Sequence, residues 1–158
     1  MDKLSSKKII SIGAIALVLI LIINSCNSRG YKDTAIAFTK AWLDGNAKKM
    51  VSLMSDDYVD EFMEKSNEST KKTLINTLKK DLEGLQENFV SSYGKKWKYE
   101  MQYIDAIKDD DVCIVTLEVT IKGKKWFSGN KKESFSIDVE LIKKGKKWYV
   151  DGTQNINA

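Results

Sequence analysis

The apolar residues of this chain change their spacing at Gly94, and this change restricts it to one kind of architecture. Before Gly94 they recur every three or four positions, which predicts amphipathic helices. After Gly94 they alternate with polar residues, which predicts strands with one buried face. Because the helices all precede the strands, the sequence predicts an α+β domain in which three to four N-terminal helices pack on a curved four-stranded antiparallel sheet.

Four stretches carry the helical spacing. The first begins near Tyr31, with Asp33 as its expected N-cap, and ends at Gly45. The second follows directly from Asn46, and a short third helix is expected over 57–65. The fourth is the longest, and its apolar stripe consists of Leu74, Leu78, Leu82, Leu85 and Phe89.

The alternating part divides into four predicted strands. Turns are expected at 109–111, at 128–130 and at Gly145, where acidic residues or glycines gather. Gly123 is expected to mark a β-bulge, and the tail 153–158 is polar. The residues expected to face the core are Trp97, Tyr99, Met101 and Tyr103; Cys113, Val115, Leu117, Val119 and Ile121; Phe135, Ile137, Val139 and Leu141; and Trp148 and Val150.

Residues 1–26 have the layout of an export signal, a positively charged start followed by an apolar run. The uncharged run from Ile9 to Ile23 would make a helix of about 22 Å, shorter than the roughly 30 Å of hydrocarbon that a spanning helix must cross. The run ends in Ile23-Asn24-Ser25-Cys26, which resembles the bacterial lipobox and implies cleavage and lipid attachment at Cys26. Two alternatives stay open, an uncleaved membrane anchor and a buried structural helix.

The chain length of 158 residues allows one core and an appendage. We expect a tether at 27–30 and a single domain over 31–152, held at the cell membrane and facing outside the cytoplasm. Cys113 is expected to be a buried core residue. The formal net charge of +4, which cleavage would lower, does not indicate a nucleic-acid partner. The absence of histidine excludes Ser-His and Cys-His nucleophile pairs and zinc sites built on histidine, and no cofactor or metal motif is present.

Two segments carry a resemblance to a known class of protein. They are AIAFTKAWLDGNAKKMVSLMS at 35–55, where two helices meet at a Gly-Asn joint, and VELIKKGKKWYVD at 139–151, which ends in a tryptophan, then Tyr149, an aliphatic residue and an aspartate. The chain resembles, over 31–151, the cone-shaped nuclear-transport-factor-2-like (NTF2-like; cystatin-like or lumazine-binding-like) domains of bacterial lipoproteins of unknown function. The resemblance implies a pocket between the long helix and the concave face of the sheet. It does not imply an activity, because this fold hosts isomerases, dehydratases, subunit adaptors and inert scaffolds.

Three residues of the first predicted strand are candidates for pocket chemistry. Tyr99, Tyr103 and Asp105 occupy alternate positions and share a face if no bulge intervenes. A phenol and a carboxylate together could polarise and deprotonate a carbonyl compound, which predicts an isomerase-like or lyase-like enzyme. The alternative, which we favour, is that the tyrosines pack at the core or its rim and the carboxylate is solvated at a strand end.

The string Gly-Lys-Lys-Trp occurs three times, at 94–97, 123–126 and 145–148. In a four-strand meander the first two copies lie at one end of the sheet and the third lies at the other. The candidate contacts to an anionic surface, such as lipid head groups or an acidic cell-wall polymer, are Lys95, Lys96, Lys124 and Lys125. The alternative is structural, since glycine makes the turn, lysine keeps the strand end soluble and tryptophan enters the core.

These observations together predict a membrane-tethered, extracytoplasmic binding or interaction module without catalysis, cofactor or nucleic-acid partner. Its ligand is expected to be small and apolar, or its partner to be an envelope protein or a second copy in a homodimer. The enzyme is the alternative from another class. A cavity lined by Tyr103 and Asp105 would favour chemistry, an apolar cavity would favour ligand carriage, and a filled interior would favour a docking scaffold.

Overall fold

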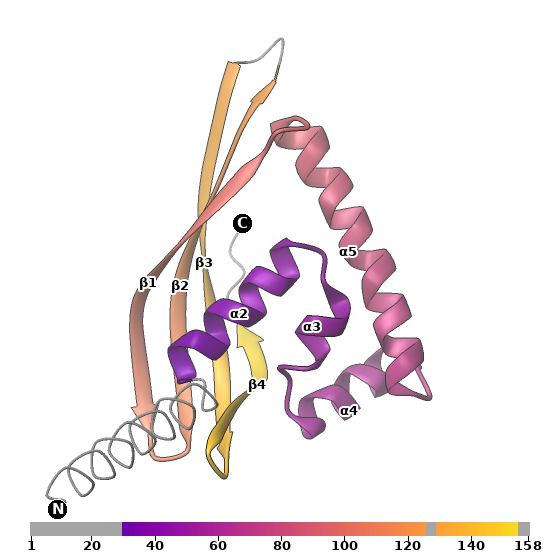
Figure 1. Cartoon of the computed structure of the whole chain (residues 1–158), viewed down its shortest axis with the longest axis vertical. Helices are drawn as coiled ribbons and strands as arrows, with labels where there is room; N and C mark the ends of the chain where they lie inside the picture. The colour runs from indigo at the N-terminus through magenta and orange to yellow at the C-terminus, as the bar shows by residue number, and fades with distance from the viewer. Residues whose placement is uncertain (1–29, 126–128, 155–158) are drawn as a thin grey trace, which may run out of the picture.

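The computed structural model describes residues 30–125 and 129–154. The predicted signal, Cys26, most of the tether, Trp126 and the end of the tail lie outside the described residues. Within them, helices come first and strands follow (Figure 1). The elements are α2 (Tyr31–Leu43), α3 (Ala47–Val51), α4 (Asp56–Lys65), α5 (Lys71–Tyr93), β1 (Lys98–Asp109), β2 (Val112–Lys125), β3 (Gly129–Lys144) and β4 (Lys147–Gln154).

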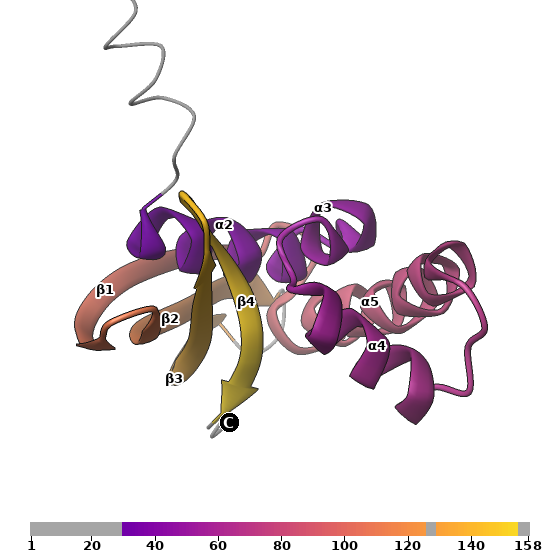
Figure 2. The same cartoon turned by 90° about the horizontal axis from the view of Figure 1, so that it is seen from below.

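The strands form one antiparallel sheet in the order β1-β2-β3-β4, as the alternating sequence predicts. Figure 2 shows that the sheet is curved and that α2 lies on its concave side. The inward positions are buried over 113–121 of β2 and over 137–141 of β3, Phe135 is partly buried, and the outward positions are polar or partly exposed. The α+β architecture predicted from the change of spacing at Gly94 is therefore confirmed. No helix among the described residues is long and apolar enough to cross a membrane.

Glycines end the helices and an asparagine begins one of them largely where the sequence predicts. Gly45 has a φ of +72° directly after α2, and the Asn46 side chain accepts a hydrogen bond from the Lys49 amide at 3.0 Å. Gly94 follows α5 with a φ of +88°. The expected N-cap Asp33 is wrong, because Gly30 occupies that position and Asp33 lies in the first turn, where its charge still suits the positive helix end.

Gly123 does not form the predicted bulge, because it pairs in register with Lys131. It instead allows close contact with the end of α5, since a Cβ atom at Gly123 would lie 2.0 Å from the Tyr93 carbonyl oxygen. The irregularities of pairing fall between Tyr103 and Asp105, and between Glu140 and Leu141.

β4 runs through Gln154, two residues into the predicted polar tail. The tail is ordered there because Thr153 pairs with Val139 and Gln154 pairs with Asp138 across the antiparallel ladder.

The loop before α4 is bound to β4 by a short parallel bridge between Met54 and Val150. The Val150 amide donates to the Leu53 carbonyl at 2.8 Å, and the Ser55 amide donates to the Val150 carbonyl at 2.7 Å. The buried Ser55 hydroxyl also caps α4 by accepting from the Tyr58 amide, and it donates to Asp151. The segment that carries Val150 and Asp151 thus joins β4 to the loop before α4.

Candidate functional site

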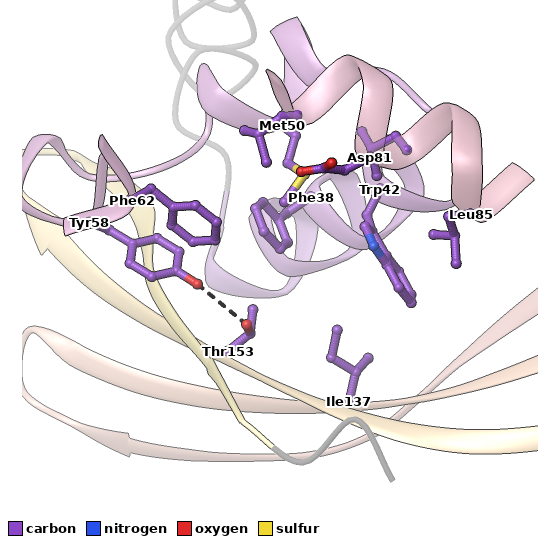
Figure 3. Close-up of a pocket in the computed structure, with 11 residues that line it drawn as sticks. Phe38, Trp42, Met50, Tyr58, Phe62, Asp81, Leu85, Ile137 and Thr153 are labelled. Carbon is purple, nitrogen blue, oxygen red and sulfur yellow. Dashed lines mark hydrogen bonds between the residues drawn. The ribbon is translucent and has the colours of Figure 1, made fainter. Parts of the chain in front are cut away.

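A pocket of about 320 Å³ lies between the helices and the concave face of the sheet (Figure 3). The resemblance predicts a pocket in this place. All four helices contribute to its wall, and β3 and β4 each contribute one residue. Its described lining is Phe38, Trp42, Met50, Tyr58, Phe62, Leu78, Asp81, Leu82, Leu85, Ile137 and Thr153.

The pocket wall follows from helical spacing. Phe38 and Trp42 are four positions apart on α2, so they lie on one face of that helix. Leu78, Leu82 and Leu85 belong to the apolar stripe of α5 that the sequence predicts as core. Part of that stripe therefore borders a space that no other part of the described chain fills.

Three polar side chains border this mostly apolar space. The Tyr58 hydroxyl lies 3.3 Å from the Thr153 hydroxyl, and the two share a hydrogen bond (Figure 3). Burial raises the pKa of Tyr58, so near neutral pH this phenol is protonated and can donate a hydrogen bond. Asp81 is exposed at the pocket wall on α5. The arrangement suits the binding and orientation of an apolar molecule that carries one polar group.

The candidate pair Tyr103 and Asp105 is not brought together. The irregularity between them adds a residue to β1, so Tyr103 pairs with Leu117 on the inward face while Asp105 pairs with Thr116 on the outward face. Asp105 is exposed and accepts a hydrogen bond from the Ala106 amide at 2.7 Å. The prediction that these side chains share a face is therefore wrong.

The two candidate tyrosines lie outside the pocket. The Tyr103 ring is half-buried beneath the Lys32 ammonium group, 4.3 Å from the ring centre, and burial raises the pKa of its hydroxyl. Tyr99 lies at the far end of α2, where its hydroxyl donates to Asp44 and accepts from Lys40 at 3.0 Å. Neither tyrosine is therefore among the described residues that line the pocket.

The Lys40, Asp44 and Tyr99 side chains form a small charged network. The Lys40 ammonium lies 2.8 Å from the Asp44 carboxylate, and the hydrogen bond between them raises the pKa of Lys40. Partial burial opposes ionisation of Asp44, but the hydrogen bonds from Lys40 and Tyr99 prevail and lower its pKa. Burial, together with the Asp44 carboxylate, raises the pKa of Tyr99. The network stabilises the end of α2 on β1 and leaves no free base.

The candidate lysines are only partly brought together. Lys96 and Lys124 line a groove of about 460 Å³ at the β2–β3 hairpin end of the sheet, whereas Lys95 and Lys125 do not. The groove also contains lysines that sequence reasoning missed: Lys98, Lys122, Lys131 and Lys132. The third Gly-Lys-Lys-Trp copy lies at the β3–β4 hairpin, at the other end of the sheet, as predicted.

Other candidates can be placed briefly. Cys113 is fully buried on β2, and burial raises the pKa of its thiol, which agrees with the predicted core role. No group of three or more His, Cys, Asp or Glu side chains in the described part of the chain could hold a metal ion.

Neither a protein-family model nor a curated protein sequence matches the chain. Solved structures of low identity share its fold. A candidate calcium/calmodulin-dependent protein kinase type II association domain from Thiobacillus denitrificans is 6% identical, with a TM-score of 0.52 over 80% of this chain and 94% of its own. A candidate NTF2-like transpeptidase from Campylobacter jejuni is 17% identical, with a TM-score of 0.48 over 78% and 99%. A protein of unknown function with a cystatin-like fold from Nostoc punctiforme is 12% identical, with a TM-score of 0.45 over 81% and 92%.

The class that the fold defines is an α+β one, helices followed by a curved four-stranded antiparallel sheet, and the Thiobacillus denitrificans association domain shares it. At these identities the similarity is one of fold alone. A fold by itself carries no activity to this chain.

Proposed function

We propose that this chain is a membrane-tethered, extracytoplasmic binding module that holds one small apolar ligand. The observation that carries this proposal is the pocket of about 320 Å³, whose described lining is apolar or aromatic apart from Tyr58, Asp81 and Thr153. Pockets for small molecules typically enclose about 300 to 1,000 Å³ and combine an apolar wall with a few polar groups that orient the ligand. A compact apolar molecule with one hydrogen-bond acceptor fits this description.

Two observations favour binding over isomerase-like or lyase-like chemistry. Acid–base catalysis needs an acid and a base that reach the same substrate, but Tyr103 and Asp105 lie on opposite faces of β1. Within the pocket, burial raises the pKa of Tyr58, which makes its hydroxyl a weaker acid, and the Asp81 carboxylate is exposed to solvent at the wall rather than buried. The apolar cavity also favours ligand carriage over a scaffold with a filled interior.

The membrane location is supported by the sequence of the first 30 residues. The lipobox-like end at Cys26 provides a site for acyl chains, and two or more chains give stable anchoring. A tether over 27–30 spans at most about 14 Å when extended. The domain would therefore stay close to the outer surface of the membrane, and a ligand would be bound there.

A direct test is native mass spectrometry of the full-length protein, purified in mild detergent from cells that normally make it. We expect a stoichiometric small-molecule adduct. A fluorescence titration with N-phenyl-1-naphthylamine, an apolar dye, then measures the affinity of the emptied pocket. A clean mass without adduct, together with no saturable dye binding, would overturn the proposal and indicate a protein-docking role.

Replacement of Leu85 by tryptophan is expected to weaken dye binding at least about tenfold, because the larger side chain occupies the cavity. Leu85→Met conserves volume and is the matched control, for which we expect a change of at most about twofold. Thermal unfolding followed by circular dichroism checks that both variants are folded. Equal dye affinity in Leu85→Trp and wild type would contradict the assignment of this cavity as the binding site.

A further inference from the structure

Lysines gather on the outer face of the sheet at the β2–β3 hairpin end. Lys98 pairs directly with Lys122, and Lys122 pairs directly with Lys132, so three lysines lie side by side on three neighbouring strands. Lys96 and Lys124 line the same groove. We call these five residues the outer lysine row.

This register is unfavourable for the fold by itself. Directly opposed side chains on neighbouring strands have Cβ atoms about 5 Å apart, and like charges at that distance destabilise a sheet. Within the described part of the chain, Lys122 is the one lysine of the row that forms an ion pair. Its ammonium group lies 2.5 Å from the Glu100 carboxylate. Lys131, which shares the groove, faces the other way and is engaged by Glu133 at 3.0 Å and by the Tyr93 ring. The row therefore keeps unneutralised positive charge.

The row lies far from the end of the domain at which the tether enters. Gly30 precedes Tyr31, whose ring contacts Trp148 at the start of β4, and Lys143 bonds to Asp111 at that same end. Figure 1 shows the start of α2 and the β2–β3 hairpin at opposite ends of the sheet. About ten residues of β2 separate these two ends of the sheet, and in an extended strand they span about 33 Å. Charges interact in physiological salt over a Debye length of only about 8 Å.

We infer that the outer lysine row binds a linear anionic polymer of the cell envelope, one built from phosphodiester-linked units. Neighbouring strands lie about 4.8 Å apart, so a polymer that crosses the strands meets an ammonium group roughly every 5 Å. The head groups of the anchoring membrane are the weaker match, because the row lies at the end of the sheet opposite the start of α2 (Figure 1). The inference rests on the proposed location outside the cytoplasm and is independent of the apolar pocket.

The test uses full-length protein in phosphatidylcholine nanodiscs and fluorescein-labelled poly(glycerol phosphate), with fluorescence anisotropy measured over a series of sodium chloride concentrations. For a row of this size we expect the logarithm of affinity to fall with the logarithm of salt with a slope of about −3. Lys98→Gln with Lys124→Gln should reduce the slope by about 1.4 and the affinity about tenfold. Lys146→Gln with Lys147→Gln, which removes the same charge at the β3–β4 hairpin, should change the affinity at most about twofold.

Four outcomes would overturn the inference: no polymer binding by wild type, equal losses in the two double variants, stronger binding to single-stranded DNA, and loss of polymer binding when the nanodiscs contain phosphatidylglycerol. The last outcome would assign the row to lipid phosphate. The dye titration on the same samples keeps this test separate from the pocket, because the lysine variants should retain dye affinity.

Discussion

Gly123→Ala is expected to lower the free energy of unfolding by about 3 kcal/mol. An added Cβ atom would lie 2.0 Å from the Tyr93 carbonyl oxygen and 2.5 Å from the Tyr93 Cβ. Neither atom is the flexible tip of a side chain, and the Tyr93 side chain is buried with its hydroxyl bonded to Glu133. Relief of the clash therefore requires the end of α5 to move away from β2. Urea unfolding followed by far-UV circular dichroism measures the effect.

Gly84→Ala is the matched control for this measurement. Gly84 lies within α5, and an added Cβ there has no heavy atom within 4 Å. Alanine is the better helix former, so we expect the free energy of unfolding to rise by up to about 1 kcal/mol. Opposite signs for the two variants support close contact at Gly123, whereas equal stability of Gly123→Ala and wild type would contradict the contact between α5 and β2.

Cys26→Ser is expected to abolish incorporation of an alkyne-labelled fatty acid into the protein. A serine cannot form the thioether that a lipobox cysteine forms, so the chain would lose the acyl anchor that each buried methylene strengthens by about 0.8 kcal/mol. Metabolic labelling followed by in-gel fluorescence gives the measurement. We expect the label to be lost completely, because the other cysteine of the chain, Cys113, is buried.

Cys113→Ala provides the control for labelling, and we expect it to be labelled like wild type. Absence of label from the wild-type protein itself would refute lipid attachment and leave the uncleaved anchor and the buried structural helix as the two alternatives. Label that persists in Cys26→Ser would refute the assignment of this residue.

Much of the architecture could be predicted because helical and strand spacing are local properties. The stripe from Leu74 to Phe89 marks α5, and the alternation from Cys113 to Ile121 marks β2, with no knowledge of distant contacts. Cap positions such as Asn46 follow from chemistry within three residues. The α+β class depends only on the order of such elements, whereas the place of the pocket was an expectation from the resemblance.

The candidate site could be predicted only in part, because it depends on pairing between strands. A bulge shifts every later side chain to the other face, and the alternating pattern carries no mark of the one that separates Tyr103 from Asp105. A second irregularity, opposite Glu140, acts in the same way on β4. Thr153 lies three residues after the inward Val150, a spacing that would place it on the outer face of a regular strand, but the irregularity brings it to the pocket.

Register explains the other misses. The alignment of Lys98, Lys122 and Lys132 is set by two hairpins, and a shift of one residue in either would disperse them. Gly123 is a different case, since a bulge and a close backbone approach both need glycine. Only the position of α5 in the folded chain distinguishes the two.

The bridge between the loop before α4 and β4 governs when the domain can fold. Ser55 and Asp151 are 96 positions apart, and Tyr58 and Thr153 are 95 apart, so these bonds form only after a very long loop closes. A nascent chain that stops before residue 147 lacks β4, and α2 and α4 then lose their contacts with that strand. Folding is therefore completed only once β4 has been synthesised, so the export proposed above would act on an incompletely folded chain before that point.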